Sequence, residues 1–200
     1  MTLILASASP RRADLLRQVG LSFTVVEPGI DEDLAVIKEP GKMVVALAQE
    51  KASVTARRFN SGFVLAADTL VVLDGLYLGK PADEDDARRM LFMLGGREHD
   101  VYTGLALLNA ATGNLKTDFA RTRVWMKLLD REYVELYLKT QEPFDKAGAY
   151  GIQGRGALFI DKIEGCYFNV VGLPLSLLFE LLIKMKVPTW LTAKEGRHGQ

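Results

Sequence analysis

Short apolar runs alternate with amphipathic stretches along this chain, and the alternation predicts strands and helices interleaved in sequence. Two pairs of runs surround tight-turn signals, one at Asp74-Gly75 and one at residues 111–114. The predicted strands cover residues 2–7 and 22–29, two runs within 62–79, and two long runs within 101–129. The predicted helices cover residues 10–19, 42–58, 81–96, 130–137 and 173–185. Long hairpins mixed with helices predict an α/β fold with a mixed, twisted sheet and flanking helices.

The chain between residues 142 and 172 is less regular. Four glycines interrupt residues 142–159, which predicts a structured loop, and residues 158–172 read as a hairpin that turns near Gly165. The pattern is lost after residue 187. A chain of 200 residues is long enough for one core of ordinary size. We therefore expect a single domain over residues 1–187 and a poorly structured tail over 188–200.

Composition limits the classes of partner. Lys plus Arg number 25, as do Asp plus Glu, so no overall basic field favours a nucleic-acid polymer or a membrane surface. Any anion site must be local. Cys166 is the single cysteine, which fits a reducing compartment, and no apolar run approaches the length of a membrane span. We expect a soluble, cytoplasmic protein.

The first predicted helix carries an unusual charge pattern. Ser9 and Pro10 favour a helix start, yet Arg11 and Arg12 follow, and a cation at a helix N-terminus costs roughly 0.3–1 kcal/mol. A phosphate bound there would turn both cations into ligands, together with Ser7 and the backbone N–H groups of the turn. The alternative is that both arginines point into solvent or pair with Asp14 and the acidic loop at residues 29–41.

Asp68 interrupts an otherwise apolar strand. A buried carboxylate needs a cation, a metal or several donors beside it, and such acids are often functional. Lys51 lies on the apolar stripe of its predicted helix and not opposite it. The competing interpretations are that Asp68 caps a strand end through local backbone or Thr69, and that Lys51 is a lysine whose head group reaches solvent.

Several polar residues in predicted turns and loops are further candidates. Lys80 could reach an anion or be a solvated turn lysine. Gln153 carries a donor and an acceptor that suit a pyrimidine edge, or it could stabilise a turn. Glu32 could add a second carboxylate to Asp68 around Mg²⁺ or Mn²⁺, or belong to an ordinary acidic loop. For His99 we expect a structural role.

Six blocks occur in one order along the chain: SASPRR, EKA, AADT, GKP, VYTG and DKAGAYGIQG. In this order they resemble the Maf family of nucleotide pyrophosphatases, and the glutamine of the last block resembles the branch that acts on dTTP and UTP. The resemblance implies two lobes around a cleft, a fold related to inosine triphosphate pyrophosphatases, and a homodimer. It implies a metal-dependent hydrolase that converts nucleoside triphosphates to the monophosphate and pyrophosphate. The implied substrates are dTTP, UTP and modified pyrimidine nucleotides.

The same resemblance implies roles for matched positions. Asp68 matches the catalytic acid-base residue, and Glu32 a metal-site carboxylate that shares the ion with Asp68. The positions associated with substrate selectivity are Arg11, Thr69 and Gln153, and the phosphate-contacting positions are Ser7, Arg12, Lys51 and Lys80. Two other functions stay open: a nucleotide-sensing regulator of cell division or septum formation with little catalysis, and the same chemistry on a different modified base.

Overall fold

The computed structural model describes residues 2–29 and 37–190. Its strands are β1 (Leu3–Ala6), β2 (Phe23–Val26), β3 (Phe63–Leu73), β4 (Leu76–Leu78), β5 (Glu98–Asn109), β6 (Leu115–Met126) and β7 (Ile160–Glu164). Its helices are α1 (Pro10–Gln18), α2 (Pro40–Ala56), α3 (Glu84–Leu94), α4 (Arg131–Leu138), α5 (Tyr167–Val171) and α6 (Leu175–Lys184). Three 3₁₀ turns, η1 (Glu142–Asp145), η2 (Ala147–Ala149) and η3 (Gly154–Phe159), make up the glycine-interrupted loop.

One mixed sheet organises the molecule. Its strand order is β2-β1-β3-β5-β6-β7, and β4 pairs with β3. The β1–β2 and β1–β3 pairs are parallel, whereas β3–β5, β5–β6 and β6–β7 are antiparallel. The mixed α/β architecture with flanking helices is therefore confirmed.

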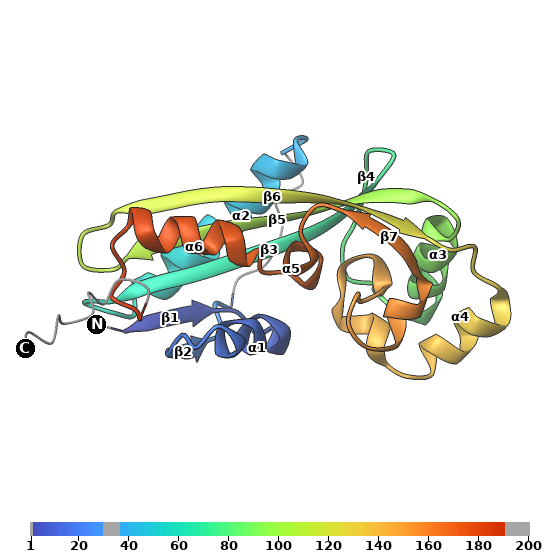
Figure 1. Cartoon of the computed structure of the whole chain (residues 1–200), viewed down its shortest axis with the longest axis horizontal. Coiled ribbons are helices and arrows are strands. Elements are labelled where there is room, and N and C mark those ends of the chain that lie inside the picture. The colour runs from blue at the N-terminus through green and yellow to red at the C-terminus, as the bar shows by residue number, and fades with distance from the viewer. Residues whose placement is uncertain (1, 30–36, 191–200) are drawn as a thin grey trace, which may run out of the picture.

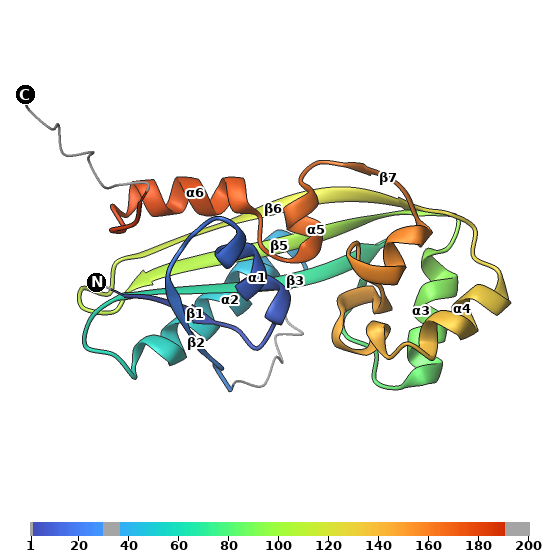
Figure 2. The same cartoon turned by 60° about the horizontal axis from the view of Figure 1, so that its bottom comes forward.

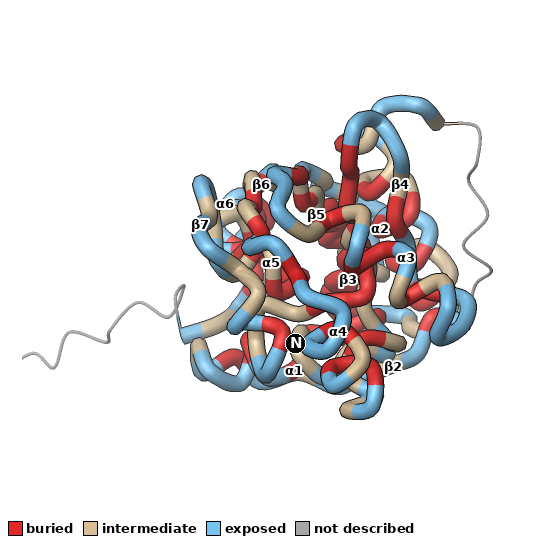
Figure 3. The backbone as a smooth tube through the Cα atoms, turned by 90° about the vertical axis from the view of Figure 1, so that its right-hand side faces the viewer, coloured by how far each residue is buried: buried red, intermediate tan, exposed pale blue. Residues whose placement is uncertain are grey.

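The long strands β3, β5 and β6 run through two lobes (Figures 1 and 2). In the larger lobe, side chains of α1 and α6 share a core with one face of the sheet, and alanines of α2 pack on the opposite face. In the smaller lobe, α3 and α4 enclose a second core with the far ends of the same strands. Figure 3 shows that the buried segments lie in the interior of the molecule, with exposed segments around them. Each lobe thus has its own apolar core, and the sheet joins them.

The predicted hairpin over residues 158–172 is wrong in its second half. β7 ends at Glu164, the chain turns at Gly165 with φ +128°, and residues 167–171 form α5 instead of a return strand. Tertiary contacts override the strand pattern here, because the fully buried Asn169 side chain donates to Val101 O and Thr122 Oγ1, each at 2.9 Å. Gly172 then ends the helix with φ +114°.

The predicted tail is described only as far as Trp190. The indole Nε1 of Trp190 donates to Val19 O at 2.9 Å, just past the end of α1. The remaining ten residues lie outside the described part of the chain.

Candidate active site

A gap in strand pairing creates the site. β1 pairs with residues 63–66 of β3, and β4 pairs with residues 71–73 along the same strand. Residues 67–70 of β3 lie between these two partners, while the antiparallel β5 pairs with residues 63–72 of β3. The run AADT therefore contributes Asp68 and Thr69 to this gap. Their side chains point to opposite faces, since successive strand residues alternate.

On the face of the sheet that α2 covers, Asp68 forms an ion pair with Lys51. The Lys51 Nζ atom lies 2.6 Å from Asp68 Oδ1, and the two side chains are only 7% and 10% exposed. The expectation that Asp68 needs a cation beside it is confirmed, and the alternative of a lysine head group in solvent is wrong. Burying one of these charges alone would be expensive, so each holds the other in place.

On the opposite face, Arg12 joins three separate segments. Its Nη1 atom donates to Ser7 Oγ at 3.1 Å, Nη2 donates to Thr69 Oγ1 at 3.0 Å, and Nε donates to Gly172 O at 2.8 Å. Ser9 occupies the N-cap position of α1, as predicted, but its side chain makes no capping bond. Its backbone N–H donates instead to Ser7 Oγ at 3.1 Å. Arg12 is thus fixed in the cleft and not directed into solvent.

A cavity of about 700 Å³ opens between the lobes at this gap. Among the described residues, its lining includes every predicted phosphate-contacting and selectivity position: Ser7, Arg11, Arg12, Lys51, Thr69, Lys80 and Gln153, together with Asp68. Glu32 lies outside the described residues. The charged side chains of the described lining are Arg11, Arg12, Lys51, Lys80 and Lys146 against Glu27, Asp68 and Asp145. This excess of positive charge suits an anionic ligand.

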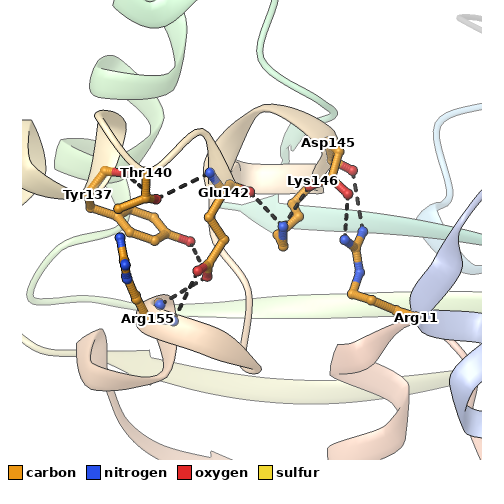
Figure 4. Close-up of polar contacts among 8 residues, drawn as sticks. Arg11, Tyr137, Thr140, Glu142, Asp145, Lys146 and Arg155 are labelled. Carbon is orange, nitrogen blue, oxygen red and sulfur yellow. Dashed lines mark hydrogen bonds and ion pairs between the residues drawn. The ribbon is translucent and has the colours of Figure 1, made fainter.

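The glycine-interrupted loop brings a second group of charged residues to the cleft (Figure 4). Arg11 Nη1 lies 2.6 Å from Asp145 Oδ2, and Lys146 Nζ lies 2.6 Å from Asp145 Oδ1. These two cations keep the pKa of the Asp145 carboxyl below its usual range, against the effect of burial. Arg11 on α1 is thereby tied to the loop across the cleft. The suggested partner Asp14 pairs with Arg17 instead.

Glu142 anchors the later part of the same loop through Arg155 (Figure 4). Its carboxylate accepts from Tyr137 OH at 2.9 Å and from the backbone N–H groups of Arg155 and Gly156 at 3.0 and 3.1 Å. These donors hold the pKa of the Glu142 carboxyl below its usual range even though partial burial acts to raise it. The Gln153 side chain, by contrast, makes no hydrogen bond within the described part of the chain, which leaves its amide for a ligand.

Motif reasoning missed Asp145, Lys146 and Glu142 as site residues. The sequence did point to this region, because Asp145 and Lys146 open the block DKAGAYGIQG and Glu142 lies three residues before it. An acid in a loop has many uses, however, and only the folded loop shows which donors it contacts.

His99 lies behind the cleft wall. Its side chain is buried, and Nε2 forms a 2.7 Å hydrogen bond with Tyr150 OH, which belongs to the cavity lining. Burial lowers the pKa of His99 to about 4, with a smaller opposing effect from Asp100. A buried neutral histidine that supports Tyr150 agrees with the structural role expected for it.

The fold and the site together define an α/β protein whose interlobe cleft gathers cations around one buried carboxylate. Residues 2–185 match the family model described as Maf-like protein. The chain belongs to the Maf family.

Relatives from several bacteria carry a specific activity in their names. A dTTP/UTP pyrophosphatase of Moorella thermoacetica is 50% identical over 188 residues, covering 94% of this chain and 97% of the relative. The dTTP/UTP pyrophosphatase of Pelotomaculum thermopropionicum is 48% identical over 182 residues, covering 91% and 95%. Among solved structures, the Staphylococcus aureus Ham1 protein has a TM-score of 0.53 at 12% identity, covering 92% of this chain and all of that one. This last likeness concerns the fold alone.

The described residues also bear on membrane insertion and on metal binding. None of the described helices combines the length and apolar character needed to cross a membrane. Within the same residues, no three His, Cys, Asp or Glu side chains come together as a metal cage. A magnesium ion needs only one or two carboxylates when substrate phosphates complete its shell, so the oxygen donors of this cleft still fit such an ion.

Proposed function

We propose that this protein hydrolyses dTTP and UTP, and related pyrimidine nucleoside triphosphates, to the monophosphate and pyrophosphate. The observation that carries the proposal is the buried Lys51–Asp68 pair, 2.6 Å apart, in a cleft whose other charged side chains are mostly cationic. A triphosphate carries about four negative charges, which a group of Arg and Lys side chains can hold. Relatives that are 46–50% identical over most of the chain are named for this activity.

In this proposal Asp68 acts as the general base. It takes a proton from the water that attacks the α-phosphorus, and pyrophosphate leaves. Lys51 orients Asp68, while Arg12, Ser7 and the start of α1 bind the phosphates. Arg11, Thr69 and Gln153 contact the nucleoside.

A divalent cation, Mg²⁺ or Mn²⁺, belongs to the same proposal. Asp68 would hold it, with Glu32 as a second carboxylate and substrate oxygens completing the shell. When bound, such an ion would neutralise phosphate charge and polarise the reacting phosphoryl group. We also propose a homodimer in the cytoplasm, as the family resemblance implies.

The test is a panel of nucleoside triphosphates scored for both monophosphate and pyrophosphate, with and without Mg²⁺. We expect release of both products from dTTP and UTP. Asp68→Asn should lower kcat by at least about 100-fold, because general base catalysis contributes that much, while the variant still binds substrate. Asp161→Asn is a matched control, since Asp161 is an exposed carboxylate on β7. Near-normal turnover by Asp68→Asn would refute the role of Asp68, and orthophosphate as the product would refute the reaction.

A further inference from the structure

We infer that Thr103 sets the substrate preference of the site by fixing the hydroxyl proton of Thr69, so that Thr69 offers the ligand a hydrogen-bond acceptor and no donor. The matching ligand group is an N–H, such as the ring N3–H of uracil and thymine. This inference rests on the proposed function and identifies a residue that determines its specificity.

Thr103 lies directly behind Thr69 in the sheet. The two residues are paired in the β3–β5 register, and their Oγ1 atoms are 3.0 Å apart. Thr103 is completely buried, so it has no contact with the cavity and acts only through its neighbours. Thr69 is partly exposed and lines the cavity.

The direction of the Thr69–Thr103 hydrogen bond follows from counting protons. Thr103 Oγ1 donates to the backbone oxygen of Asn169 at 3.0 Å, and a carbonyl oxygen can only accept. A hydroxyl has one proton, and that of Thr103 is used in this bond. The proton between the two hydroxyl groups must therefore come from Thr69.

Arg12 uses part of the remaining capacity of Thr69. Its Nη2 atom donates to Thr69 Oγ1 at 3.0 Å, and a guanidinium has donors only. The Thr69 oxygen therefore gives its proton to Thr103 and one lone pair to Arg12. What is left for a ligand is a second lone pair, which accepts a hydrogen bond and cannot donate one.

The carbonyl that receives the Thr103 proton is itself held firmly. Asn169 is fully buried, and its side-chain Nδ2 donates to Val101 O and to Thr122 Oγ1, each at 2.9 Å. These contacts tie α5 to β5 and β6, so the Asn169 carbonyl cannot turn away without breaking buried hydrogen bonds. The proton order of Thr69 and Thr103 is thus built into the packing of α5 on the sheet.

This order discriminates between pyrimidines. Uracil and thymine carry a hydrogen on N3, whereas N3 of cytosine is an acceptor. A cytosine N3 facing Thr69 would place two acceptors together, and a site that leaves a buried polar group unpaired rejects a ligand strongly. Without the Thr103 hydroxyl, Thr69 can rotate its proton toward the ligand and accept either base.

The test compares kcat/KM for UTP and CTP in the wild type, Thr103→Val and Thr103→Ser. We expect the UTP/CTP ratio to fall at least about tenfold in Thr103→Val, the size expected when one polar contact stops discriminating. Thr103→Ser keeps the hydroxyl, so its ratio should stay within about threefold of the wild type. Thr69→Val, which removes the acceptor itself, should also lose the preference and serves if Thr103→Val does not fold.

A purely structural role for Thr103 would lower both rates and leave the ratio unchanged, and that result would overturn the inference, as would a wild-type ratio in Thr69→Val. The proposed function fails separately, if the wild type releases no pyrophosphate from UTP. In that event the same variants are compared by calorimetric binding of UTP and CTP, and an unchanged ratio of Kd values would again contradict the inference.

Discussion

Glu142 shows how a single side chain outside the cavity lining can shape the site. Its carboxylate accepts hydrogen bonds from two successive backbone N–H groups, those of Arg155 and Gly156, which follow Gln153 in the same loop. Hydrogen bonds to a charged acceptor are worth about 1.5–3 kcal/mol, more than neutral ones. Glu142 therefore acts as a positioning residue for Gln153.

We predict that Glu142→Gln raises KM for UTP several-fold and changes kcat less. The reason is that an amide offers one acceptor oxygen to three donors, so the loop loosens while Asp68 and Lys51 stay in place. Steady-state kinetics on the variant checks this. Glu132→Gln, an exposed glutamate in the first turn of α4, is the control and should behave as wild type. An unchanged KM in Glu142→Gln would show that the loop does not depend on this carboxylate.

His99 gives a prediction about pH. Its folded-state pKa is about 4, below the ordinary value of 6.5, because burial disfavours the charged ring. Between these two pH values the unfolded chain binds a proton that the folded protein does not, so stability falls as the pH drops from 6.5 towards 4. Above pH 6.5 the residue contributes no pH dependence.

We predict that lowering the pH from 7 to 4.5 costs the wild type about 2 kcal/mol more unfolding free energy than it costs His99→Gln, which cannot titrate. Urea unfolding at both pH values measures the difference. Equal pH dependence in the two proteins would show that folding does not lower the pKa of His99.

Site residues could be predicted from the sequence where a side chain does not fit the hydrophobic or charge pattern of its predicted element. An acid in an apolar strand, a lysine on an apolar helix stripe and arginines in a first helical turn are each locally unfavourable, and the structure brings Asp68, Lys51, Arg11 and Arg12 to one cavity. Glu142 and Asp145 break no pattern in their loop, so nothing local distinguished them. Thr103 is an ordinary strand residue whose role depends on its partners across the sheet.

At the scale of elements, the site depends on how closely α2 approaches the sheet. A Cβ atom built on Gly104 would lie 2.4 Å from the backbone of Val44, so only glycine allows this packing. Gly104 is paired with Asp68 in the β3–β5 register, and Lys51 lies two helical turns beyond Val44 on the same helix. The spacing between α2 and β5 therefore sets the spacing between Lys51 and Asp68.

We predict that Gly104→Ala lowers stability by about 1–3 kcal/mol, the usual cost of overpacking, and lowers kcat with UTP by more than tenfold, because α2 must move away from the sheet. Thermal unfolding and steady-state kinetics check the two effects. A folded variant with wild-type turnover would show that the Lys51–Asp68 distance does not control the reaction.

Elements with strong local signals were predicted well. The Asp74-Gly75 turn joins β3 and β4 with positive φ at both residues, and Asp83 caps α3 through a 2.8 Å bond from Asp86 N. α5 was missed because its apolar residues suit a strand, and the buried contacts of Asn169 come from β5 and β6, distant in sequence. Local pattern cannot register a partner of that kind.

For the whole molecule, the mixed sheet makes the site possible. A parallel half built on β1 supplies the start of α1, which lines the cavity, and an antiparallel half extends β3 and β5 into a second lobe. The cleft lies where the two halves meet on β3, and the Arg11–Asp145 ion pair crosses it. The fold class followed from the interleaved pattern, but the gap between β1 and β4 depends on strand register, which the sequence pattern does not specify.

In the proposed reaction, the cleft delivers water to the α-phosphorus of a bound nucleoside triphosphate. The most direct test is hydrolysis of UTP in water labelled with oxygen-18, followed by mass spectrometry of both products. We predict that the label enters UMP and that the released pyrophosphate carries none. Label in pyrophosphate, or in orthophosphate, would place the attack on another phosphorus and contradict the claim.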